Sequence, residues 1–315
     1  MLPAAAKALD WLTIQFARRS PQRGFARDAQ RSEVLAHLAD PQFFADCIAA
    51  PADFKLNSTH AFEFTSPIHS PWPANNRAYG RLYRCGEDWQ SRPSVILIHG
   101  WNGEMNYYTL FPWLAKRLAQ HRVNTALLVL PYHAGRKPRG RGVMRNFISD
   151  DVPRVLEATQ QSVADIRALA AWLRAQGSPQ ITVWGFSLGA WLTGLVACLE
   201  EHLQRYVLAT PIVSMQRAME LPFCEPLHAA LQHFGARLDR FDLAALQPRV
   251  PPDNILLAES LHDLFAPADT VEALWRAWNQ PPIQRFPHGH ISILFSPAAM
   301  KNLVAWVVQS RIIIP

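Results

Sequence analysis

The stretch that decides the fold is residues 181–199, ITVWGFSLGAWLTGLVACL. It opens with the apolar run Ile181–Trp184, which predicts a buried strand, and a helix is expected over Leu188–Leu199. Between them stands the G-x-S-x-G pattern Gly185–Gly189, centred on Ser187. In this context the pattern predicts a sharp strand-to-helix turn that projects the Ser187 hydroxyl at the positive end of the helix dipole. The alternative is a serine in an ordinary glycine turn.

A second glycine-containing turn follows the apolar run Val95–Ile98, with the sequence His99-Gly100-Trp101-Asn102-Gly103. If Ser187 attacks a carbonyl, the resulting oxyanion needs backbone N–H donors aimed at it. The amides of Leu188 and Trp101 are the predicted donors. His99 precedes the turn at Ser187 in the chain, so it is expected to brace this loop by hydrogen bonds and not to transfer protons.

A carboxylate that orients an imidazole is expected in the loop after the strand Ile255–Ala258. Two residues compete there, Glu259 and Asp263. Asp263 is the preferred acid because it lies in the loop just past the strand end, whereas Glu259 is closer to the strand itself.

The proton-transferring base is expected after the strand Ile283–Phe286, where His288 and His290 flank a glycine. His290 is preferred because Ile291 can anchor it in the core, and an ordinary imidazole pKa near 6.5 suits the task. His288 remains the alternative. A metal held by the two histidines has no evident third ligand, so neither a metal nor a cofactor is predicted.

Strand and helix patterns alternate around these motifs, which predicts an α/β protein with a mostly parallel central sheet and helices on both faces. Ligands of such sheets bind at the carboxyl ends of the strands. The remaining expected strands are Ala61–Thr65, Ala78–Arg84, Thr125–Leu130 and Tyr206–Ala209, and the remaining helices are Pro112–Ala119, 152–173, Asp269–Trp278 and Ala298–Val308.

Three segments are predicted: a helical N-terminal extension over 1–60, a main domain over 61–315, and a cap inserted at about 214–252. The cap is inferred because a structureless loop of that length is improbable in a compact domain. In the extension, Ala5, Leu9, Leu12 and Phe16 share one helical face. This stripe is expected to pack on its own domain or to lie on a membrane surface.

His99-Gly100, Gly185–Gly189, Asp263 and Gly289-His290 stand in an order that resembles the α/β-hydrolase family over about residues 78–310. The resemblance implies the α/β-hydrolase fold and a Ser187–Asp263–His290 triad. Residues 130–138, LPYHAGRKP, are similar to a segment of the abhydrolase domain-containing protein 18-like group. That narrower likeness implies no particular substrate.

Basic residues give the chain a net charge of +6 and a pI near 9.4. Five of them lie within Arg136–Arg145, so Arg136 is a candidate for binding an anionic group on a substrate. The alternative is a solvated loop paired with Asp150 or Asp151. These residues do not belong to a nucleic-acid-binding module, so nucleic acid is not an expected partner.

Aromatic residues near the two turns, Trp101, Tyr107, Tyr108 and Phe186, are expected to wall an apolar acyl pocket, although each could equally be core packing. The preferred reaction is hydrolysis of a small-molecule or lipid carboxylic ester through an acyl-enzyme. Acyl transfer and a non-catalytic binding role are the alternatives. The four cysteines show no pairing pattern, and neither a signal peptide nor a membrane span is recognised, so a cytoplasmic location is expected. The oligomeric state is not predicted.

Overall fold

The computed structural model describes residues 2–19, 31–40, 42–57, 59–138 and 147–309. These residues form a nine-stranded sheet in the order β1-β2-β3-β5-β4-β6-β7-β8-β9. The strands are β1 (Lys55–Leu56), β2 (Ala61–Thr65), β3 (Arg77–Tyr83), β4 (Ser94–Ile98), β5 (Asn124–Leu128), β6 (Ile181–Phe186), β7 (Arg205–Ala209), β8 (Ile255–Ser260) and β9 (Ile283–Phe286). The pairs β1–β2, β2–β3 and β3–β5 are antiparallel, and the pairs from β5 through β4, β6, β7 and β8 to β9 are parallel. The prediction of a mostly parallel sheet is confirmed.

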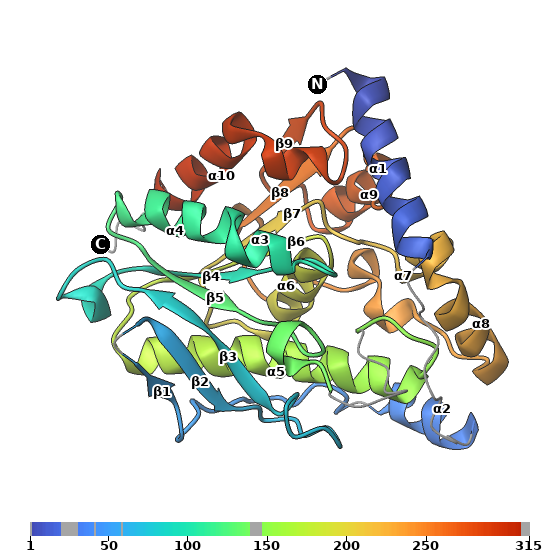
Figure 1. Cartoon of the computed structure of the whole chain (residues 1–315), viewed down its shortest axis with the longest axis horizontal. Coiled ribbons are helices and arrows are strands. Elements are labelled where there is room, and N and C mark those ends of the chain that lie inside the picture. Colours follow the sequence, from blue (N-terminus) through green and yellow to red (C-terminus); the bar gives the residue numbers. More distant parts are fainter. Residues whose placement is uncertain (1, 20–30, 41, 58, 139–146, 310–315) are drawn as a thin grey trace.

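Helices cover both faces of the sheet (Figure 1). One apolar core joins the sheet to α5, α6 and α9, and a second joins it to α4 and α10. Because both faces are covered, the central strands are buried along their whole length. The helices are α1 (Pro3–Arg18), α2 (Arg31–Ala39), α3 (Glu104–Tyr108), α4 (Leu110–Ala119), α5 (Val152–Ala175), α6 (Leu188–Leu199), α7 (Met215–Met219), α8 (Glu225–Phe234), α9 (Ala268–Ala277) and α10 (Pro297–Gln309).

Helix α6 and strands β2 and β9 begin and end at the predicted residues, and the other predicted strands and helices of the sheet domain differ by one or two residues at one or both ends. Strand β1 and helix α3 have no counterpart in the prediction. The short strand β1 pairs with β2 and lies within the stretch 1–60 that was expected to be helical. None of the helices in the described ranges combines the length and the apolar character needed to span a bilayer.

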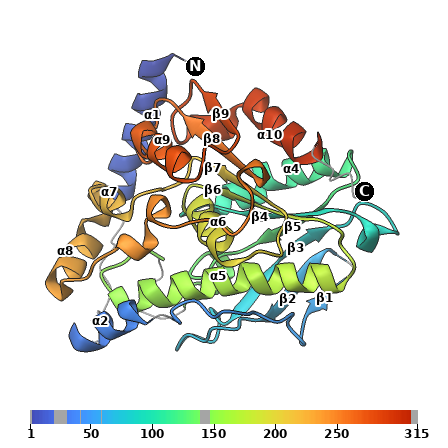
Figure 2. The same ribbon diagram turned by 180° about the vertical axis from the view of Figure 1, so that it is seen from behind.

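The segment between β7 and β8 contains α7, α8 and several short 3₁₀ helices, among them η3 (Pro222–Cys224). Helix α8 ends at Gly235, whose φ of 63° is the left-handed conformation common at helix ends. Figure 2 shows α7 and α8 on the same side of the molecule as α1. Helix α2 contacts α8, so both parts of the N-terminal stretch reach this region.

Helix α1 packs on the domain through a different face from the predicted one. Its buried residues are Ala6, Asp10, Ile14 and Ala17, whereas Leu12 and Phe16 of the predicted stripe are exposed. The helix contacts η3 and η7 (Ser292–Phe295). Two small alanines allow this close approach, and the polar Asp10 is buried because backbone amides of the domain bind its carboxylate.

Candidate active site

Ser187 lies in a strained turn between β6 and α6, with φ of 55° and ψ of −118°. The turn requires glycine on both sides of the motif. A Cβ atom on Gly185 would stand 2.1 Å from the carbonyl oxygen of Gly189, and one on Gly189 would stand 2.4 Å from that of Ile98. The glycines therefore permit the crowded turn that presents Ser187 at the carboxyl end of the central strand.

Hydrogen bonds join Ser187, His290 and Asp263 in a row. The Nε2 atom of His290 lies 2.7 Å from the Ser187 Oγ, and its Nδ1 atom lies 2.7 Å from Asp263 Oδ2. The second carboxylate oxygen of Asp263 accepts hydrogen bonds from the amides of Phe265 and Ala266, each at 2.8 Å. With one oxygen held by two amides, the other is fixed in place to receive the imidazole N–H.

The imidazole of His290 is buried beneath the ring of Phe265, which stacks on it at 4.6 Å between centroids. Burial alone lowers the pKa of His290, but the carboxylates of Asp263 and Asp10 raise it by more, so the pKa lies above the usual value of 6.5. The site thus favours the positive charge that the imidazole gains when it takes a proton.

The alternative acid and base occupy other positions. Glu259 is buried and forms an ion pair with Arg285, its neighbour across β8 and β9, at 2.9 Å. The Nδ1 atom of His288 is buried without a hydrogen-bond partner in the described part of the chain. Neither residue belongs to the row that reaches Ser187.

The amides proposed for an oxyanion hole lie at the two turns. Gly100 approaches Ser187 so closely that a Cβ atom on it would stand 3.1 Å from the Ser187 Cβ. Trp101 follows Gly100, and Leu188 is the first residue of α6, where an N–H group has no partner within the helix. Within the described ranges, neither amide donates to a turn or loop acceptor.

His99 makes the bracing contacts that were expected of it. Its Nδ1 lies 2.8 Å from the Gly100 oxygen, and its Nε2 accepts a hydrogen bond from the Leu130 amide at 3.1 Å. Burial lowers its pKa to about 4. The ring is therefore neutral at physiological pH and fixes the turn that precedes Trp101.

A cavity of about 390 Å³ opens beside Ser187 and His290. Aromatic and aliphatic side chains from the β4 and β6 turns, from α1 and α6, from the segment between β7 and β8 and from the loop after β8 line it, among them Trp101, Phe186, Trp191, Met219, Phe223 and Phe265. Thr13, Thr159 and Thr210 also line it, but each hydroxyl donates to a backbone carbonyl of its own segment. Within the described residues, no Asp, Glu, Lys or Arg lines the cavity.

Two of the aromatic residues assigned to the pocket are placed elsewhere, which corrects that prediction. Tyr107 is 3% exposed and packs in the core between α4 and the sheet, and Tyr108 is 55% exposed on the surface. Both belong to α3, which turns them away from the cavity. Trp101 and Phe186 do line it.

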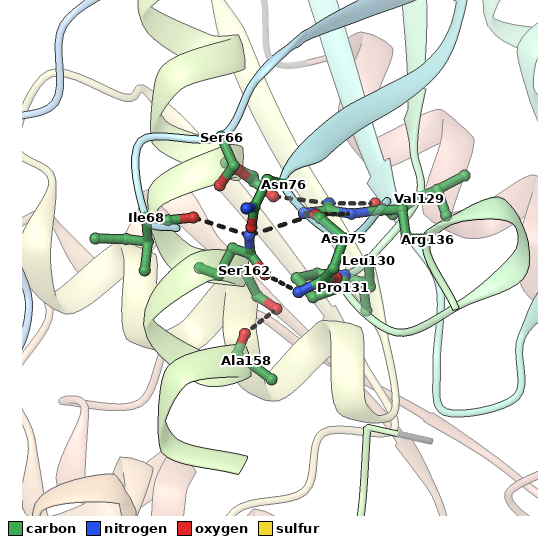
Figure 3. A network of polar contacts seen from close by, with 12 residues as sticks. Ser66, Ile68, Asn75, Asn76, Val129, Leu130, Pro131, Arg136, Ala158 and Ser162 are labelled. Carbon is green, nitrogen blue, oxygen red and sulfur yellow. Dashed lines mark hydrogen bonds and ion pairs between the residues drawn. The ribbon is translucent and has the colours of Figure 1, made fainter. Parts of the chain in front are cut away.

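Arg136 is also not a substrate-binding residue, because it is fully buried in a polar network (Figure 3). Its guanidinium donates to the carbonyl oxygens of Asn75 and Val129 and to Asp165 of α5, with an ion-pair distance of 2.7 Å. Ser66 donates to the other oxygen of Asp165. The guanidinium ties the loop after β5 to α5. Arg139, Arg141 and Arg145 lie outside the described residues.

Replacing Arg136 with methionine is therefore expected to lower the free energy of unfolding, by about 3–5 kcal/mol, because Asp165 would be left buried without its cation. Urea unfolding measures this. Lys137→Met is the control, since Lys137 pairs with Glu104 near the surface and its loss should cost about 0–1 kcal/mol. Equal effects of the two variants would contradict the structural role of Arg136.

The sequence analysis missed the residues that come from distant segments. These are Asp10, whose carboxylate reaches the His290 loop, and Thr13 and Phe16, which line the cavity. The available signal was an acidic residue four positions after Ala6 and four positions before Ile14, on an otherwise apolar helix face. Within the described ranges, no cluster of three or more His, Cys, Asp or Glu side chains could hold a metal ion.

Comparison with known proteins identifies a family and a set of similar folds. A model described as "Alpha/beta hydrolase family" matches residues 95–313. Two uncharacterized proteins from strains of Mycobacterium tuberculosis are 30% identical over 257 residues, which is 77% of this chain. The matched part spans 59% of those relatives' own length.

Solved structures share the fold at low sequence identity. Acetyl xylan esterase 1 from Thermoanaerobacterium has a TM-score of 0.59 and 18% identity, with 93% of this chain and 98% of that chain covered. An esterase from Pyrococcus furiosus has a TM-score of 0.54 and 13% identity, with 92% and 99% covered. At these identities the likeness concerns the fold alone.

Proposed function

Because the chain belongs to the alpha/beta hydrolase family, we propose that it is a serine hydrolase that cleaves a carboxylic ester through an acyl-enzyme. The observation that carries this proposal is the row of 2.7 Å contacts from Ser187 through His290 to Asp263. A serine in this arrangement has both a base to take its proton and a carboxylate to fix the tautomer of that base.

In the proposed mechanism, Ser187 Oγ attacks the ester carbonyl while its proton passes to His290 Nε2. The carbonyl oxygen becomes an oxyanion and accepts hydrogen bonds from the Leu188 and Trp101 amides. His290 then gives the proton to the departing alkoxide, which leaves as an alcohol, and Ser187 carries the acyl group. Water repeats the sequence with His290 as base, releasing the acid and restoring Ser187. These steps require no cofactor.

The apolar lining of the cavity favours an ester with a hydrophobic acyl chain, including a lipid ester. Phe16, Met105 and Phe295 line the cavity and are also exposed, so apolar surface continues from the site to the exterior. This continuity would suit contact with a lipid surface.

The four cysteines are free thiols, which is consistent with activity in the reducing environment of the cytoplasm.

Hydrolysis of p-nitrophenyl esters of increasing acyl length tests this function. We expect kcat/KM to rise about fourfold for each added methylene until the cavity is filled, from about 0.8 kcal/mol per buried CH₂. Beyond that length kcat/KM should stop rising. The absence of hydrolysis at every length would contradict the proposed activity, and a rate independent of length would contradict the apolar acyl site.

A pair of variants locates the acyl site. Ala218 of α7 lines the cavity, whereas Ala229 of α8 is exposed. Ala218→Leu is expected to lower kcat/KM for the longest esters and to leave acetate esters little changed, because the larger side chain shortens the cavity. Ala229→Leu should leave the chain-length profile as it is. Identical profiles for the two variants would place the acyl chain elsewhere.

A further inference from the structure

The carboxylate of Asp10 reaches the two loops that carry the acid and the base of the site. Its Oδ2 accepts hydrogen bonds from the His290 amide at 2.7 Å and the Leu264 amide at 3.1 Å. Its Oδ1 accepts one from the Ile291 amide at 3.0 Å. Leu264 directly follows Asp263, and Ile291 directly follows His290. One side chain thus links the loop after β8 to the loop after β9.

Asp10 is fully buried, and the absence of a side chain at Gly289 leaves room for it. A Cβ atom on Gly289 would stand 2.7 Å from Asp10 Oδ2 and 2.9 Å from the Ala6 carbonyl oxygen. Only glycine therefore lets α1 approach the His290 loop this closely. Burial raises the pKa of Asp10, and the three amide donors and His290 act in the opposite direction. Both oxygens accept from N–H groups, which matches an ionised carboxylate.

We propose that Asp10 is a positioning residue of the active site, which holds the Asp263 and His290 loops in register and places a second negative charge behind the base. This inference rests on the proposed function of the site. In this proposal α1 has a role in catalysis, although it lies far from Asp263 and His290 in the sequence.

The groups that face His290 determine how its pKa would change if the charge of Asp10 were removed. Asp263 from the loop after β8 contacts Nδ1, Ser187 from the turn after β6 contacts Nε2, and Phe265 stacks on the ring. Asp10 from α1 holds the backbone amide of His290. Since a nearby carboxylate stabilises the imidazolium, removal of the Asp10 charge would move the titration of His290 to lower pH.

Asp10→Asn removes the negative charge and keeps the size of the side chain, whereas Asp10→Ala removes the whole carboxylate group. The amide oxygen of asparagine can keep the bonds from His290 and Leu264, but its NH₂ group would then face the Ile291 N–H, two donors in contact. We expect kcat to fall about tenfold for Asn and about a hundredfold for Asp10→Ala, with a smaller change in KM, because the base is misplaced by a fraction of an ångström. The acid limb of kcat/KM should shift to lower pH in both variants.

Ile14→Ala is the matched control, because Ile14 is buried on the same face of α1 and its aliphatic side chain cannot accept a hydrogen bond from the two loops. It should lower the melting temperature while leaving kcat and the acid limb near wild type. If Ile14→Ala reproduces both effects of Asp10→Asn, or if Asp10→Asn leaves both unchanged, the positioning role is wrong.

Amide hydrogen exchange gives a readout that does not depend on activity. In Asp10→Asn the amides of Leu264, His290 and Ile291 should exchange faster than in Ile14→Ala, because their acceptor is lost or weakened. Unchanged exchange would overturn the link between the loops. An inactive wild-type protein with this exchange pattern would contradict the proposed function but leave the link between the loops in place.

Discussion

Replacing Ser187 with alanine lowers kcat for ester hydrolysis by about 10⁴–10⁶, since the change removes the nucleophile and leaves only the oxyanion donors and binding. The fold should tolerate the change, because within the described residues the Ser187 hydroxyl makes its hydrogen bond with His290 and with no other side chain. Steady-state kinetics with a p-nitrophenyl ester measure the loss. A fluorophosphonate probe should label the wild-type protein at Ser187, located by peptide mapping, and should not label the variant.

Ser260→Ala provides the control for this experiment. Ser260 is buried at the end of β8, and its hydroxyl has no hydrogen-bond partner within the described ranges. The variant is expected to keep both the label and the wild-type kcat. If well-folded wild-type protein is not labelled and hydrolyses no ester, the chain does not use Ser187 as a nucleophile, and a binding role on the same fold becomes the better explanation.

The second large effect is expected from Asp263→Asn, which should lower kcat by about 10⁴ by imposing the wrong imidazole tautomer. The amides of Phe265 and Ala266 already donate to one oxygen at this position, so the asparagine oxygen would take those bonds. Its NH₂ group would then face His290 Nδ1, which must accept, and Nε2 would carry the proton. A protonated Nε2 cannot receive the proton of Ser187.

The pH profile adds a second measurement to this prediction. The Asp263 carboxylate raises the pKa of His290, so Asp263→Asn should move the acid limb of kcat/KM to lower pH. Glu259→Gln is the control, because Glu259 pairs with Arg285 and not with the imidazole. A loss of comparable size in Glu259→Gln would reverse the assignment of the acid.

Local sequence patterns were sufficient to predict strand β6, the turn at Ser187 and helix α6. The all-apolar strand, the two glycines around Ser187 and the apolar face of α6 act over a few residues, so the sequence predicts the turn and its position. Chain order supplied Asp263 and His290, because the acid and the base of this fold follow successive strands. The structure brings these residues into contact.

The errors concern residues whose environment is made by distant segments. Arg136 was assigned to the substrate because its neighbours are basic, yet Asp165 and the Asn75 carbonyl, far along the chain, enclose it. The buried face of α1 was misplaced because the large apolar residues Leu12 and Phe16 outweighed Ala6 and Asp10 in a reading of periodicity. A buried carboxylate is stable only where hydrogen-bond donors surround it. The backbone donors to Asp10 lie 254 to 281 residues away in the sequence.

The contacts of Asp10 also have a consequence for biosynthesis. Helix α1 leaves the ribosome before the later elements of the described chain, but the amides that bind the Asp10 carboxylate belong to residues 264, 290 and 291 and leave much later. Until then the carboxylate of Asp10 lacks the three amide donors that bind it in the folded protein. The row of contacts from Ser187 to Asp263 can form only after almost all of the described chain has been synthesised, because His290 belongs to it. A nascent chain that carries Ser187 alone would therefore expose the proposed nucleophile without its proposed base.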